Sequence, residues 1–170
     1  AYDYDAQGRV AAINESQWKE IYTYEQDRLV SKQRFFKPDQ SLYAANTFQY
    51  NTEGLLTASG DKVYTSSFAY EAGRLRNIIY RRKADSTYQD ITFRYNQSLL
   101  VTVSIEATDP YLKPAFLMAS DYFYSSWKSK AVNRIRYDFA YDAHQNIKEI
   151  RYTVNDRYLY SKQFLYTYYP

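Results

Sequence analysis

The chain has 170 residues, including 22 Tyr, 9 Phe and 2 Trp, and a formal net charge of +3 with no cysteine. The lack of cysteine excludes a disulfide scaffold, a cysteine-based zinc site and a cysteine nucleophile. The small net charge argues against nucleic acid as a partner, and no apolar stretch approaches the ~18 residues of a transmembrane helix. The length suffices for one domain with its own core.

A four-residue motif recurs along the chain. It consists of an aromatic residue, any residue, a tyrosine, and then Asp, Glu or Asn. Internal repeats of this kind indicate that one supersecondary unit is used several times. Six full copies begin at Tyr2, Tyr22, Phe48, Phe68, Phe93 and Phe139, and two looser copies begin at Tyr122 and Tyr166.

The copies fall into two classes with a common period of about 46 residues, which predicts two hairpins in each period. The first class holds Tyr4, Tyr50, Tyr95 and Tyr141, and the second holds Tyr24 and Tyr70. A third member of the second class is missing near Phe116. In its place we expect an irregular insertion over 108–121.

Each copy predicts a strand, a tight turn and a second strand. The two motif aromatics share one strand face, and the acidic or amide residue that follows starts the turn. A residue that tolerates positive φ comes next, and an apolar residue then opens the second strand. Along 99–105 apolar and polar positions alternate, as in a half-buried strand. The turn-forming positions are Asp5, Glu25, Asn51, Glu71, Asn96 and Asp142, and the residues expected to tolerate positive φ are Gly8, Asp27, Gly54, Gly73 and Asn146.

This layout predicts an all-β chain with about 13 strands in an antiparallel meander built from tandem hairpins. Because a flat sheet of that length exposes a wide aromatic face, we expect it to curl into an open sheet, a half-barrel or a barrel. One irregular or short helical segment is expected near 109–119. We treat 1–170 as a single β-repeat domain.

The motif resembles the tyrosine–aspartate (YD, Rhs-type) repeat, most clearly in the runs 4–10 and 70–75. That resemblance implies a β-hairpin architecture, and known YD-repeat proteins form β-sheet shells or surface arrays, some enclosing toxins and some suggested to bind carbohydrate. The stretches 109–125 and 141–147 look like secreted lipoproteins of unknown function from Bacteroidetes-type bacteria. This second resemblance implies an extracytoplasmic location, at the cell surface or in the periplasm, and a lipid anchor upstream of residue 1.

No convergent set of catalytic or metal-binding residues is visible. The repeated carboxylates share one turn position with Asn51 and Asn96, and an amide cannot replace a catalytic acid. The single histidine, His144, has no second His or Cys to complete a metal site. We therefore expect no catalytic residue, no metal and no cofactor, and a hydrolase is the least favoured reading.

The aromatic residues are the best candidates for a binding surface, because Tyr and Trp stack on sugar rings and are enriched at interaction hot spots. Packing within the core is the alternative for both tryptophans. Breaks in a repeat tend to carry function, so we favour the irregular segment and its flank. The candidate binding residues are Trp127, Tyr122, Tyr124, Tyr111 and Trp18.

The sequence thus favours a non-catalytic, extracytoplasmic binding or scaffold domain of a bacterial surface protein, with a glycan or another protein as partner. The alternative is a periplasmic carrier that holds an apolar ligand in a half-barrel cavity beneath 110–118. The oligomeric state does not follow from the sequence.

Overall fold

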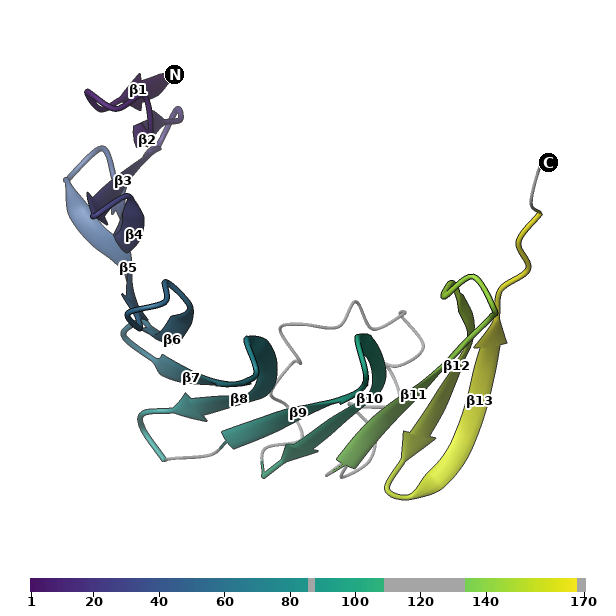
Figure 1. Ribbon diagram of the computed structural model, residues 1–170. Helices are drawn as coiled ribbons and strands as arrows, with labels where there is room; N and C mark the ends of the chain where they lie inside the picture. The colour runs from purple at the N-terminus through teal and green to yellow at the C-terminus, as the bar shows by residue number, and fades with distance from the viewer. Residues whose placement is uncertain (86–87, 109–133, 168–170) are drawn as a thin grey trace. The chain divides into compact units, whose positions relative to one another are not determined.

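A computed structural model describes residues 1–85, 88–108 and 134–167, and these residues form thirteen β-strands (Figure 1). The strands are β1 (Tyr2–Tyr4), β2 (Val10–Asn14), β3 (Trp18–Glu25), β4 (Arg28–Phe36), β5 (Ser41–Tyr50), β6 (Leu56–Gly60), β7 (Tyr64–Glu71), β8 (Arg74–Arg82), β9 (Tyr88–Asn96), β10 (Leu99–Ala107), β11 (Arg134–Tyr141), β12 (Ile147–Val154) and β13 (Arg157–Gln163).

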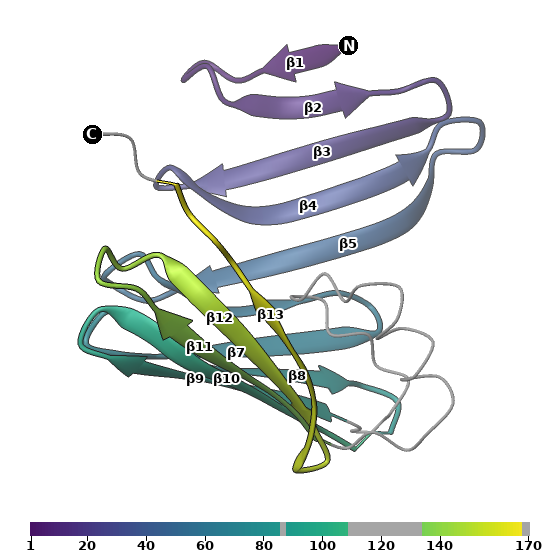
Figure 2. The same ribbon diagram turned by 90° about the vertical axis from the view of Figure 1, so that its right-hand side faces the viewer.

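The strands form one open antiparallel sheet in which each strand pairs with the next along the chain. Figure 2 shows this order clearly for β1 to β5. The predicted all-β meander of about 13 strands is confirmed. The described residues contain no helix that is long and apolar enough to cross a membrane. The irregular or helical segment expected near 109–119 lies outside the described residues.

Contacts between residues group the chain into two compact units. The first comprises 1–68 and 82–84, and the second comprises 69–81 and 85–170. The expectation that 1–170 is a single domain stays a prediction.

One class of motif turn has five residues between the paired strand positions and is closed by the side chain of its first residue. Asp5 Oδ1 accepts hydrogen bonds from the backbone N–H groups of Gln7 and Arg9, both at 2.9 Å. Asp142 Oδ1 accepts from His144 and Asn146 at 2.8 and 2.9 Å. This is the local bonding that makes Asp and Asn good turn residues.

The amide at the equivalent position makes the same kind of bond. Asn51 Oδ1 accepts from the N–H of Leu55 at 2.9 Å, and the N–H of Gly54 donates to the Asn51 carbonyl at 3.0 Å. An amide oxygen therefore does at residue 51 what a carboxylate oxygen does at residues 5 and 142, so the turn needs an acceptor and not a charge.

The second class of turn has two residues between the paired strands and depends on backbone conformation. Glu25 pairs with Arg28, and the intervening Gln26 and Asp27 have φ of 47° and 63°. Two successive residues with positive φ are typical of a type I′ hairpin, whose twist matches that of the flanking strands. Ala72–Gly73 and Asn155–Asp156 adopt the same conformation.

Two details of the turns differ from the prediction. In the turn that follows Tyr141 the positive φ, 65°, belongs to Gln145 and not to Asn146, whose N–H is held by Asp142. Tyr95 pairs with Leu100, five residues later, as Tyr24 pairs with Leu29. Its spacing had placed it with Tyr4, whose partner Val10 is six residues later. The tyrosine spacing therefore does not determine the turn type.

The hydroxyl of a motif tyrosine joins one hairpin to the second strand of the hairpin before it. Tyr24 Oη donates to the carbonyl of Val10 at 3.0 Å, and Tyr50 Oη donates to that of Leu29 at 2.9 Å. In both cases the acceptor is the residue that pairs with the tyrosine of the preceding motif, Val10 with Tyr4 and Leu29 with Tyr24. The same bond links Tyr95 to Leu75, Tyr141 to Leu100 and Tyr166 to Ile147.

Arginines that precede the apolar residue strengthen these links. The Arg9 guanidinium carbon lies 4.5 Å from the centroid of the Tyr24 ring, and its Nη1 donates to Asp27 Oδ1 at 2.7 Å. Arg28 lies 5.8 Å from the Tyr50 ring and donates to the carbonyl of Asn51 at 3.2 Å. Arg74 contacts Tyr95 and Gln97 in the same way. Each arginine thus contacts the tyrosine and the turn of the following hairpin through a cation–π contact and a hydrogen bond.

The most deeply buried apolar side chains lie in the second unit. Register pairs Ile78 with Ile91, Ile91 with Ile105, and Ile105 with Ile135, so β8 to β11 place one row of isoleucines on one face. Ile105 and Ile135 are each 1% exposed. The predicted alternation holds from Val103 onward, whereas the register shifts between Leu100 and Thr102. That irregularity makes the N-terminal part of β10 depart from strict alternation.

Candidate functional site

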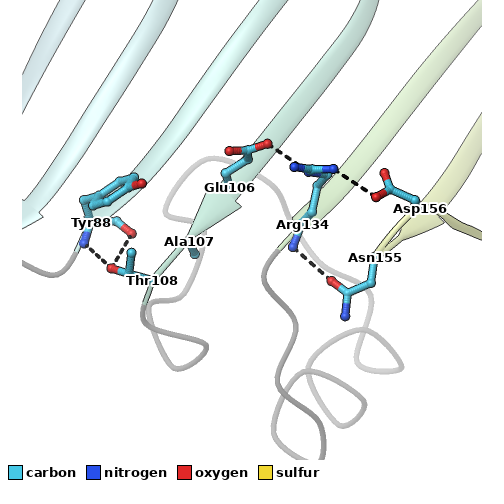
Figure 3. A pocket seen from close by; sticks show the side chains of 7 residues that line it. All are labelled: Tyr88, Glu106, Ala107, Thr108, Arg134, Asn155 and Asp156. Carbon is cyan, nitrogen blue, oxygen red and sulfur yellow. Dashed lines mark hydrogen bonds and ion pairs between the residues drawn. The ribbon is translucent and has the colours of Figure 1, made fainter.

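A pocket of about 420 Å³ lies in the second unit, at the strand ends opposite the motif turns of β9 to β12 (Figure 3). We call it the strand-end pocket. Its lining residues come from the start of β9, the end of β10, the start of β11 and the turn between β12 and β13. They are Tyr88, Glu106, Ala107, Thr108, Arg134, Asn155 and Asp156.

Strand register determines which side chains face this pocket. Glu106 pairs with Arg134 across β10 and β11, directly beside the buried pair Ile105 and Ile135. Because neighbouring residues of a strand point to opposite faces, Glu106 and Arg134 lie on the face away from the isoleucines. Their side chains are 54% and 48% exposed.

The turn between β12 and β13 completes the charged part of the pocket. Asn155 Oδ1 accepts from the backbone N–H of Arg134 at 3.1 Å, which fixes the turn against the start of β11. Asp156 Oδ2 then lies 2.9 Å from Arg134 Nη1, and Glu106 Oε1 lies 2.8 Å from Arg134 Nε. Figure 3 shows the three charged side chains in a row, with the guanidinium in the middle.

The two carboxylates determine the electrostatics of the pocket. Their negative charges raise the pKa of Arg134 above its usual value, and the charge of Asp156 contributes more than that of Glu106. The guanidinium is therefore a fixed cation. Two carboxylates and one guanidinium give the lining a formal charge of −1. All three side chains are open to water, which screens the pairs and leaves their polar atoms accessible.

Tyr88 and Thr108 form the other side of the pocket. The backbone N–H of Tyr88 donates to Thr108 Oγ1 at 3.0 Å, which fixes the threonine hydroxyl beside the first residue of β9. The Arg81 guanidinium carbon lies 5.4 Å from the centroid of the Tyr88 ring and holds the ring by a cation–π contact. The pocket therefore combines an aromatic wall with hydroxyl, carboxylate and guanidinium groups.

A second cluster, in the first unit, contains the one predicted binding residue that the structure describes. The Trp18 ring lies 4.8 Å from the Tyr43 ring and 5.1 Å from that of Phe36, centroid to centroid. The Arg34 guanidinium carbon lies 4.6 Å from the Trp18 ring. Tyr43 is 69% exposed, whereas Trp18 is half-buried. Trp18 thus forms the inner part of the cluster, and Tyr43 forms the part that is exposed to solvent.

A polar network lies beside this aromatic cluster. Tyr22 Oη donates to Glu20 Oε2 at 2.6 Å, and Lys32 Nζ lies 3.0 Å from Glu20 Oε1. Burial, together with the hydrogen bond to Glu20, raises the pKa of Tyr22 to about 12. The Tyr22 hydroxyl and Lys32 lower the pKa of Glu20 against the opposing effect of burial. The network links β3 to β4, and each of its three polar side chains has a partner within it.

The other predicted binding residues, Tyr111, Tyr122, Tyr124 and Trp127, lie outside the described residues. Of the predicted turn residues, Asp5, Asn51 and Asp142 accept the turn hydrogen bonds, whereas Glu25, Glu71 and Asn96 end the strands that enter two-residue turns. Among the described residues, no group of three or more His, Cys, Asp or Glu side chains is arranged to hold a metal ion.

Sequence reasoning missed Glu106, Arg134 and Asp156. Glu106 and Arg134 are 28 residues apart and become neighbours only through the pairing of β10 with β11. The one available signal is the Asn155–Asp156 pair, whose residue types are typical of turns but do not show what the turn faces.

Comparison with solved structures shows the fold alone. The chain superposes on a crystal structure of TcdB2-TccC3-Cdc42 with a TM-score of 0.61 and 13% identity over 95% of its length, and spans 9% of that chain. A crystal structure of TcdB2-TccC3 gives a TM-score of 0.57 and 14% identity, again over 95% of this chain and 10% of the other. A porin-like protein from Bacteroides uniformis gives a TM-score of only 0.35. No protein-family model matches the chain, and no curated protein matches it significantly.

The first two structures show that this chain shares an extended β-sheet fold with a small part of much longer chains.

Proposed function

We propose that the chain is a non-catalytic binding and scaffold domain of an extracytoplasmic bacterial surface protein, with a glycan or a protein as its partner. The observation that carries the proposal is the use of the repeated polar groups. Tyrosine hydroxyls, turn carboxylates and arginines are engaged in bonds within and between hairpins, at Tyr141, Asp142 and Arg9 for example. Such bonds build a sheet and leave the repeat no chemistry of its own.

The equivalence of Asn51 with the acidic turn residues supports the non-catalytic part. Its amide oxygen makes the bond that Asp142 makes with a carboxylate. A general acid or base needs a group that ionises, and an amide does not. The repeated carboxylates therefore act in turns.

Among the described residues, the strand-end pocket and the aromatic cluster of Trp18, Phe36 and Tyr43 are the surfaces that we assign to a partner. Aromatic side chains combine large contact area with little loss of conformational entropy, and they dominate many binding interfaces. The carrier alternative receives no support from the strand-end pocket, because charged residues line it and an apolar ligand would strip them of water. The segment 110–118, beneath which the carrier cavity is expected, lies outside the described residues.

Two binding assays test the proposal. In one the purified chain is applied to an immobilised glycan array, and in the other it is cross-linked to surface proteins of the source cell. We expect saturable binding to one of the two partner classes, weakened by Tyr43→Ala or by substitutions in the strand-end pocket. Turnover of a glycoside, ester or peptide substrate that is lost in Asp142→Asn would refute the non-catalytic assignment.

A further inference from the structure

We propose that the strand-end pocket binds a neutral polyhydroxyl ligand, that is, one sugar unit of an uncharged glycan. This inference rests on the proposed binding function and names the class of ligand that the pocket takes. It follows from the hydrogen-bonding groups of the lining, from their charge and from the size of the pocket.

The lining offers both acceptors and donors within one hollow. Glu106 and Asp156 present carboxylate oxygens, each of which keeps lone pairs beyond the one used by Arg134. Arg134 has five N–H donors in a planar fork, and Thr108 has a hydroxyl that both donates and accepts. Vicinal hydroxyl groups, which donate and accept in the same way, match this set better than a ligand that can only accept.

The paired charges disfavour ionic ligands, and an anion more than a cation because the lining has a formal charge of −1. An anion that approaches Arg134 also meets Glu106 and Asp156, whose oxygens lie 2.8 and 2.9 Å from the guanidinium. A cation that approaches either carboxylate meets the guanidinium between them. A neutral polar ligand is repelled by neither charge. Its hydroxyl groups can also form hydrogen bonds with ionised partners, which are stronger than hydrogen bonds between neutral groups.

Size and shape agree with one sugar unit. A volume of about 420 Å³ lies within the roughly 300–1,000 Å³ of small-molecule sites. Tyr88 supplies an aromatic wall that Arg81 holds in place. An aromatic ring packs well against the C–H groups of a sugar while carboxylates bind its hydroxyls.

Saturation-transfer difference NMR on the full chain tests the assignment. The probes are neutral sugars (glucose, galactose, mannose, N-acetylglucosamine and their disaccharides), with glucuronate as an anionic probe and myristate as an apolar one. We expect transfer to at least one neutral sugar. Glu106→Gln and Asp156→Asn each remove a charged acceptor and should raise the dissociation constant for the sugar about tenfold.

Glu149→Gln is the matched control, because Glu149 belongs to the same unit and has a long ion pair with Arg151, 4.0 Å, away from the pocket. It should leave sugar binding unchanged. Far-ultraviolet circular dichroism shows whether each variant keeps its sheet.

Three results would overturn the inference: no transfer to any neutral sugar, a preference for glucuronate or myristate, or equal binding by the pocket variants and by Glu149→Gln. Capture of a protein partner with no sugar binding would overturn the ligand class but keep the proposed function. Neutral-sugar binding that depends on Tyr43 and not on Glu106 would support the proposed function. It would overturn the assignment of the sugar to the strand-end pocket and place it at the aromatic cluster.

Discussion

Replacing Gly54 with alanine should destabilise the sheet more than the same change at Gly8, although both glycines occupy equivalent turns. Both have positive φ, 85° at Gly54 and 77° at Gly8. Alanine in this conformation costs about 1–2 kcal/mol from backbone strain alone. The two positions differ in what a Cβ atom would meet.

A Cβ atom at Gly54 would lie 2.8 Å from Arg28 Nη2 and 3.1 Å from Arg28 Cζ, whereas one at Gly8 meets nothing within 4 Å. Arg28 is flexible and can move aside, so the cost is the loss of its contacts and not a fixed clash. Those contacts are the hydrogen bond to the Asn51 carbonyl and the cation–π contact with Tyr50. Together they are worth about 1 kcal/mol at an accessible site.

Urea denaturation monitored by circular dichroism measures the difference. We expect Gly8→Ala to lower the free energy of unfolding by about 1–2 kcal/mol and Gly54→Ala to lower it by about 2–3 kcal/mol. In an Arg28→Ala background the two glycine substitutions should become equal, because the contacts at stake are already gone. Equal effects of the two substitutions in the unmodified chain would refute the role given to Arg28.

Three further predictions concern single side chains. Tyr141→Phe removes the 2.6 Å hydrogen bond to the Leu100 carbonyl and should cost about 1 kcal/mol in urea denaturation; a cost no larger than that of Tyr4→Phe would contradict the tyrosine link. Asp142→Asn should change the free energy of unfolding by less than about 0.5 kcal/mol, whereas Asp142→Ala should cost about 1 kcal/mol, since Asn51 serves in the equivalent turn. Tyr22 should titrate near pH 12 by ultraviolet absorbance, and Glu20→Gln should lower that value. Because the folded-state pKa of Tyr22 lies above the unfolded value of about 10, its contribution to stability is complete below pH 10 and lost as the pH rises through about 12. A Tyr22 titration unmoved by Glu20→Gln would assign the shift to burial alone.

The sequence predicts the hairpins well because their determinants are local. A motif aromatic and a tyrosine two residues apart share a strand face, and Asp5 or Asn51 closes its own turn within four residues. The turn after Tyr95 is not predicted by this logic. Its Gln97 has a φ of 52°, like Gln26 and Ala72 at the same turn position, but the next residue is Ser98 where the other two-residue motif turns have Asp27 or Gly73.

The candidate site could not be predicted in the same way. Arg134 meets Glu106 through strand pairing across 28 residues, and it meets Asp156 only after the turn between β12 and β13 has formed. Such neighbours depend on register over several strands, which no local pattern encodes. The sequence singles out Trp18 for its chemistry, yet its surroundings are set by Arg34 and Phe36 on β4 and by Tyr43 on β5.

The tyrosine link between hairpins is chemically one-sided. One hairpin contributes a specific hydroxyl, and its neighbour contributes a main-chain carbonyl, a group that every amino acid carries, as at Val10, Leu75 and Ile147. A neighbour can therefore change its side chain at that position without breaking the bond. Duplicated hairpins can drift apart in sequence, or be exchanged for one another by recombination, as long as each keeps its own tyrosine.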